Sequence, residues 1–116
     1  MLRAVIAARQ REISLMLKSF ARGIALLHVA LFILFVLYLQ FGTSDGQSRL
    51  LWTVWLPIDF PVSLITLAGL DLVQGESELA STFRRLLPFF VHGSLGPIWW
   101  YFLVMTIGRI FSRLHR

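Results

Sequence analysis

The sequence contains no cysteine and few charged residues. The absence of cysteine among the 116 residues excludes disulfide bonds, thiolate metal ligands and thiol catalysis. Charged residues make up 15% of the chain, against about 25% in soluble domains. Hydrophobic residues make up 57%, and a chain this short cannot bury so much apolar side chain in a core of its own. The composition therefore predicts a protein embedded in lipid.

Acidic residues are also scarce. The chain has six Asp and Glu and eleven Arg and Lys, which gives a formal net charge of +5. The basic residues gather near the two ends and at residues 84–85, where a membrane protein carries the charges that set its orientation. Nucleic acid is therefore not expected as a partner. The motifs G-x-S-x-G and HExxH and a Gly-rich phosphate loop are absent from the sequence, so we expect no enzyme, no catalytic residue and no metal ligand.

Two long apolar segments predict membrane-spanning helices. Residues 23–41 carry no charge, and at a rise of 1.5 Å per residue they cover roughly 28 Å, close to the thickness of the hydrocarbon layer. Residues 88–108, which begin at Pro88, form the second segment. Residues 1–22 combine basic and apolar side chains at helical spacing and predict an amphipathic helix at the cytoplasmic surface. Residues 109–116 form a basic tail.

The segment between the two predicted spans, residues 50–73, is apolar but interrupted. Pro57 and Pro61 flank Asp59, and a proline frees backbone groups that lipid cannot satisfy, while a carboxylate at the bilayer centre is costly. We expect a re-entrant or surface-lying half-helix that starts at Pro61 and ends at residue 73; a third span is the alternative. Residues 77–87 predict a short amphipathic helix.

The distribution of basic residues favours a hairpin with both ends in the cytoplasm. In that topology the inside regions carry eight basic residues and the outside three; with a third span the tally is seven against four. The positive-inside rule favours the hairpin with both ends in the cytoplasm. The predicted fold is thus an all-α integral membrane protein of one domain, residues 1–116, built as a transmembrane helical hairpin with a Pro-broken segment inserted in it.

Four tryptophans are candidate contacts with the bilayer interface or with partner chains. If the last helix breaks at Gly96–Pro97, its aromatic residues lie at the outer interface together with those of the middle segment. The four tryptophans are Trp52, Trp55, Trp99 and Trp100.

His28 and His92 are the residues that could hold a cofactor. Two imidazoles from two helices are one way to ligate the iron of haem b. Each histidine lies four or five residues into its predicted span, so parallel helices would bring them to the same depth. Antiparallel helices would place them at opposite depths. Because the hairpin is favoured, we expect no haem.

The remaining candidates are Gly93, Gly96 and Asp59. The two glycines allow a neighbouring helix to approach closely. Asp59 is expected to cap a helix, to pair with an Arg of a partner subunit, or to line a water-filled cavity. These residues, with the tryptophans, are the predicted partner-binding set.

The function expected from these observations is that of a small accessory or assembly subunit of a larger complex in the bacterial inner membrane. Its partners would be membrane lipid and larger subunits. A self-assembling pore-former of the holin or toxin type, a homo-oligomer, is the first alternative. A haem-b-binding electron-transfer subunit is the second.

Overall fold

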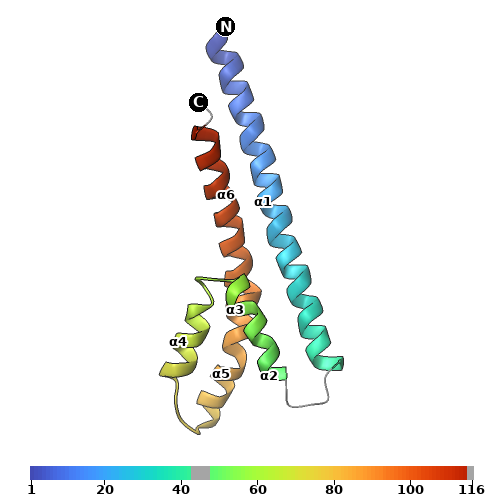
Figure 1. The fold of residues 1–116 in the computed structure, drawn as a ribbon, viewed down its shortest axis with the longest axis vertical. Coiled ribbons are helices and arrows are strands. Elements are labelled where there is room, and N and C mark those ends of the chain that lie inside the picture. Colours follow the sequence, from blue (N-terminus) through green and yellow to red (C-terminus); the bar gives the residue numbers. More distant parts are fainter. Residues whose placement is uncertain (43–47, 115–116) are drawn as a thin grey trace.

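Two long helices run side by side in opposite directions, and shorter helices fold back between their connected ends (Figure 1). The structure, a computed structural model, describes residues 1–42 and 48–114, which form helices joined by turns and short irregular stretches. It measures 69 × 30 × 20 Å. In chain order the elements are α1 (Leu2–Phe41), α2 (Ser48–Leu51), the 3₁₀ turn η1 (Trp52–Val54), α3 (Trp55–Ile58), α4 (Leu64–Leu72), α5 (Glu78–Phe90), the π-helical segment η2 (Val91–Leu95) and α6 (Gly96–Leu114).

Helix α1 is one unbroken element of 40 residues. The predicted amphipathic helix, residues 1–22, and the predicted span, residues 23–41, are therefore one continuous helix. Its buried residues are Ala21, His28 and Phe32, which are seven and four positions apart and so lie on one face. That face packs along α6.

The second long helix consists of α5, η2 and α6, which follow one another without a gap from Glu78 to Leu114. Pro88 lies inside α5 and does not begin a new helix. The helix does not break at Gly96–Pro97, because the wide turn η2, closed by a hydrogen bond from the Gly96 N–H to the Val91 carbonyl, leads directly into α6. The condition under which Trp99 and Trp100 would lie at the outer interface is therefore not met, and both lie within α6.

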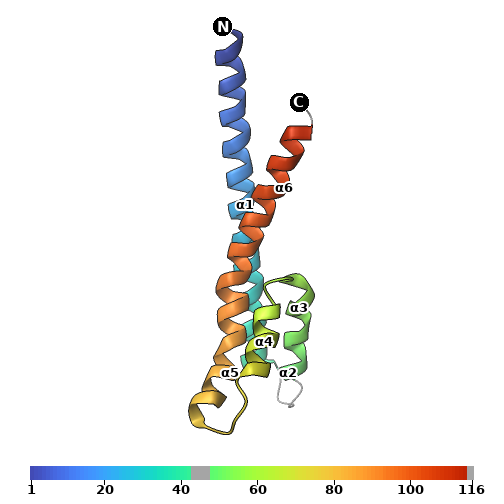
Figure 2. The same cartoon turned by 90° about the vertical axis from the view of Figure 1, so that its left-hand side faces the viewer.

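The segment between the long helices folds back on itself. Helices α2, η1 and α3 lead from the connected end toward the middle of the hairpin, the chain turns after Ile58, and α4 returns (Figures 1 and 2). Helix α4 begins at Leu64 and not at Pro61, because Pro61 lies in the turn. No element of this segment is long enough to span a membrane, and the described residues contain two helices that are.

Both described ends of the chain lie at the same end of the molecule (Figure 1), as a hairpin requires. The short helix predicted at residues 77–87 corresponds to the start of α5, where the Ser77 hydroxyl accepts a hydrogen bond from the Ala80 N–H at 3.2 Å. The predicted basic tail is helical up to Leu114, and its last two residues lie outside the described part of the chain.

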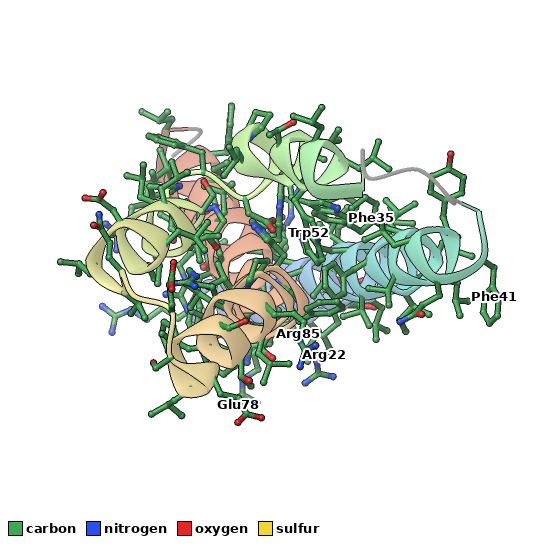
Figure 3. All side chains as sticks on the ribbon, turned by 90° about the horizontal axis from the view of Figure 1, so that it is seen from below. Arg22, Phe35, Phe41, Trp52, Glu78 and Arg85 are labelled. Carbon is green, nitrogen blue, oxygen red and sulfur yellow. The ribbon has the colours of Figure 1, made fainter. Side chains whose placement is uncertain are left out.

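The interior is small and mainly aromatic. Phe32 packs edge-on against Trp55, with ring centroids 5.3 Å apart, and Trp52 packs against Phe35 at 5.0 Å and Phe89 at 4.9 Å. Figure 3, seen from below, shows Phe35 and Trp52 directed toward each other between α1 and the folded-back segment. This cluster fixes the folded-back segment to both long helices. Most other large apolar side chains are exposed.

Candidate functional site

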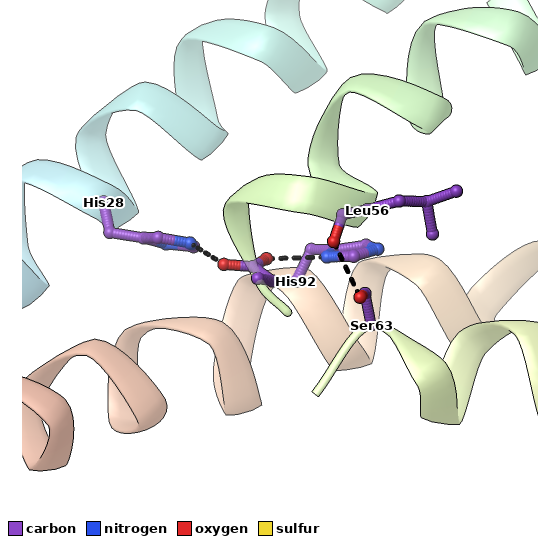
Figure 4. A network of polar contacts seen from close by, with 5 residues as sticks. His28, Leu56, Ser63 and His92 are labelled. Carbon is purple, nitrogen blue, oxygen red and sulfur yellow. Dashed lines mark hydrogen bonds and ion pairs between the residues drawn. The ribbon is translucent and has the colours of Figure 1, made fainter. Parts of the chain in front are cut away.

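A carboxylate hydrogen-bonded to two imidazoles lies at the centre of the molecule. Asp59 Oδ1 is 2.6 Å from His28 Nε2, and Asp59 Oδ2 is 2.6 Å from His92 Nδ1 (Figure 4). The exposed fractions of Asp59, His92 and His28 are 0%, 1% and 6%. Because an ionised carboxylate can only accept, both ring nitrogens donate N–H to it. We call these three residues the His-Asp-His trio.

Three separate elements supply the trio. His28 comes from α1, His92 from the π-helical segment η2, and Asp59 from the residue that ends α3. The backbone of the turn holds Asp59 in place: its N–H donates to the Trp55 carbonyl and its carbonyl accepts from the Ser63 N–H, both at 3.0 Å. The Ser63 hydroxyl closes the same turn by donating to the Leu56 carbonyl at 2.7 Å (Figure 4).

The prediction that a hairpin would place His28 and His92 at opposite depths is wrong. In an antiparallel pair, depth is measured from the connected end. His28 lies thirteen residues before the end of α1 at Phe41, and His92 lies fourteen residues after the start of α5 at Glu78. The two side chains are therefore level. The error came from counting from the predicted span starts at residues 23 and 88, whereas the helices extend well beyond both.

Aromatic rings enclose the trio. Trp55 meets the His28 ring edge-on at 5.2 Å, and Trp52 is stacked near the His92 ring at 6.1 Å. These two tryptophans, predicted as partner contacts, thus serve inside the chain. Trp99 and Trp100 of α6 are half-buried.

Gly93 and Gly96 lie against other parts of the same chain. A Cβ at Gly93 would come within 2.8 Å of the Phe32 ring, and a Cβ at Gly96 would come within 2.8 Å of both Asp59 Oδ2 and His28 Cε1. The expected close approach of another helix is therefore present, and the helix is α1. Gly96 is glycine because a side chain there would enter the trio.

Asp59 finds its partners within its own chain. The expectation that an Arg of a partner subunit satisfies this carboxylate is wrong, since each of its oxygens accepts from an imidazole. The signal that the sequence analysis missed was the equal spacing of His28 and His92 from the connected end.

The trio does not fit the haem hypothesis. Iron held by two imidazoles needs the space between the two ring nitrogens, and here the Asp59 carboxylate lies in that space. Nor does any group of three His, Asp or Glu within residues 1–42 and 48–114 have the arrangement of a metal site.

Several buried polar atoms near the helix interface have no hydrogen-bond partner in the described part of the chain. These are His28 Nδ1, Trp55 Nε1, Thr66 Oγ1 and Trp100 Nε1. An unpartnered buried polar atom is uncommon in proteins and calls for an explanation. For His28 the unpartnered atom is the ring nitrogen that does not contact Asp59.

A comparison of the chain with protein-family models, with curated proteins and with solved structures finds no match.

Proposed function

We propose that the protein is a small accessory or assembly subunit of a larger complex in the bacterial inner membrane, with α1 and the helix α5–η2–α6 crossing the bilayer. Both helices are long and apolar enough to do so. The folded-back segment α2–α4 is then re-entrant, entering and leaving the bilayer at the outer face.

The charges support one placement in the bilayer. A Cβ at Gly108 would fall on the Leu17 side chain, so Lys18 on α1 and Arg109 on α6 stand at one level. Arg85 lies on the second helix toward its other end, 24 residues before Arg109, which is roughly 36 Å along a helix. A hydrocarbon layer of about 30 Å fits between them. The His-Asp-His trio then lies near the bilayer centre.

The observation that carries the proposal is the part of α1 that projects past α6. Forty residues extend roughly 60 Å, about twice the hydrocarbon thickness, and Figure 1 shows α1 reaching beyond the end of α6. Its apolar side chains share one helical face and are exposed: Leu2 by 75%, Val5 by 62%, Ile6 by 52% and Ile13 by 45%. The rest of the chain, as far as it is described, does not cover them, and we take them as the surface on which the partner subunit packs.

Replacing Ile6 and Ile13 together with Glu is expected to lower the yield of copurifying larger subunits at least tenfold. Each side chain buried in an interface contributes about 1.5–3 kcal/mol, and a buried unpaired carboxylate adds a further penalty. Insertion and the fold around the trio should not change, since both positions lie far from it along α1. The measurement is quantitative mass spectrometry of the complex after mild detergent extraction, with membrane insertion assayed in parallel.

Gln10→Glu is the control, because it adds a carboxylate, one where the double variant adds two, at an exposed polar position of the same projection and should leave the yield unchanged. Full copurification of the double variant would refute the accessory role. Recovery of the chain only as a homo-oligomer that depolarises membranes would favour the pore-forming alternative.

The proposed orientation is testable because the chain has no cysteine of its own. A single Cys at Glu76, between α4 and α5, is expected to react with a membrane-impermeant maleimide in intact cells. Single Cys residues at Gln10 and at Arg113 should react only after permeabilisation. All three native residues are exposed, so access depends on the side of the membrane. Labelling of position 113 but not position 10 in intact cells would contradict the hairpin topology.

A further inference from the structure

The end of the hairpin that holds both chain ends carries cations on two adjoining helices. Leu17 of α1 and Gly108 of α6 lie against each other, because a Cβ at Gly108 would fall on the Leu17 side chain. Lys18 and Arg109 each follow their contact residue by one position, which turns each of them about 100° around its helix. Seen from one end, antiparallel helices turn in opposite senses. The two residues therefore lie on the same side of the hairpin.

Three more cations extend this surface along the two helices. Arg22 lies four positions after Lys18, and Arg11 lies seven positions before it. Arg113 lies four positions after Arg109. These spacings return to one helical face, and Figure 3 shows Arg22 extending outward from α1. The five exposed cations, which we call the basic face, are Arg11, Lys18, Arg22, Arg109 and Arg113.

No carboxylate neutralises the basic face. Among the described residues the ion pairs are those of Asp59 with His28 and His92, so none of the five cations pairs with an acid there. Helix α6 contains no acidic residue. Glu12, the one acidic residue of α1, follows Arg11 by one position and is therefore turned about 100° away from it. Five like charges on one side of a helix pair repel one another, so the face is suited to bind an anion.

Toward the connected end of the hairpin, the same side of both helices becomes apolar. Ile33 lies eleven positions after Arg22 on α1. Phe102 and Ile98 lie seven and eleven positions before Arg109 on the second helix. Such spacings keep to one helical face, and the three apolar side chains are exposed by 53%, 59% and 52%. A cationic end that continues into an exposed apolar strip matches the order of phosphate and acyl chains in a phospholipid.

We propose that the basic face and the apolar strip bind an anionic phospholipid, with its phosphate held by Lys18, Arg22 and Arg109 and its acyl chains along the strip. Lys18 and Arg109 stand at the cytoplasmic edge of the hydrocarbon layer in the placement described above. Arg22 is one turn deeper and reaches the same level with its long side chain. Basic pockets between transmembrane helices on the cytoplasmic side recognise acidic head groups in this way. The inference rests on the proposed placement across the bilayer and not on the subunit role.

Native mass spectrometry of the purified chain in a neutral detergent tests this site, with phosphatidylglycerol and phosphatidylcholine of identical acyl chains as the probes. The two lipids differ in the net charge of the headgroup. Each cation near an anionic headgroup contributes about fivefold in affinity. We therefore expect phosphatidylglycerol to bind about tenfold or more tightly than phosphatidylcholine. Equal affinities for the two lipids would refute the proposal.

Replacing Arg22 and Arg109 together with Gln is expected to lower the affinity for phosphatidylglycerol about tenfold or more, and to leave that for phosphatidylcholine unchanged. The matched control replaces Arg9 and Arg85 with Gln, which removes the same charge from two exposed positions. Arg9 lies two positions before Arg11, on the opposite side of α1, and Arg85 lies toward the other end of the second helix. Equal losses in the two double variants would refute the site, because net charge alone would then set the affinity.

Free glycerol phosphate separates the headgroup from the acyl chains. Displacement of bound phosphatidylglycerol by an equal concentration of glycerol phosphate would mean that the apolar strip takes no part, and the lipid assignment would be wrong. The comparison of the two lipids on the unsubstituted chain decides the proposal even if a variant fails to fold. The subunit role is tested separately by copurification, since lipid binding is measured on the purified chain without other subunits.

Discussion

Replacing Asp59 with Ala is expected to lower the free energy of unfolding of the detergent-solubilised protein by about 2 to 6 kcal/mol. The change removes the one acceptor shared by His28 and His92, and each buried donor left without a partner costs about 1–3 kcal/mol. Asp59→Asn should have a smaller effect, because the amide retains one acceptor oxygen. The measurement is unfolding by a denaturing detergent, followed by circular dichroism.

Asp71→Ala is the matched control for that experiment. Asp71 lies on α4, in the same folded-back segment, and is exposed, so its removal should change the free energy of unfolding by less than about 0.5 kcal/mol. Equal effects at positions 59 and 71 would mean that the trio does not hold the three elements together.

Gly96→Ala and Gly23→Ala are expected to shift stability in opposite directions. A Cβ at Gly96 would lie 2.8 Å from both Asp59 Oδ2 and His28 Cε1. Those two side chains are hydrogen-bonded to each other, so they cannot move away from the new Cβ without weakening that bond. Overpacking of this kind costs about 1–3 kcal/mol.

At Gly23 a Cβ would meet nothing within 4 Å, and Ala inside a helix is favoured over Gly by about 0.5–1 kcal/mol. The pair therefore compares one chemical change in crowded and in open surroundings. The same unfolding assay measures both variants. A Gly96→Ala protein as stable as Gly23→Ala would contradict the packing of Gly96 against the trio.

Much of the architecture could be predicted from the sequence. The apolar runs at residues 23–41 and 88–108 predict two long helices and the prolines around Asp59 predict an interrupted segment between them, and the structure has both. The helix boundaries could not be predicted from hydropathy. Helix α1 extends to Leu2, because the polar residues of this stretch have high helix propensity and continue the helix without tertiary contacts.

The trio could not be predicted because its geometry depends on those helix boundaries. His28 and His92 seemed to lie at opposite depths only because the apolar runs were taken as the complete helices. Asp59 looked like a group in need of an external partner because sequence separation hides a contact between residues 31 and 33 positions apart. Glycine at positions 93 and 96 indicated a close helix approach, but spacing alone did not identify α1 as the neighbour.

The order in which the trio's residues are synthesised has a consequence for how the chain matures. His28 and Asp59 precede His92, and chains begin to fold from the N-terminus during translation. When the turn at Asp59 leaves the ribosome, its carboxylate has one of its two imidazole partners, and the second arrives 33 residues later. At about 5–20 residues per second, that interval lasts roughly two to seven seconds. During it the half-formed hairpin carries a carboxylate with one of its two native hydrogen bonds.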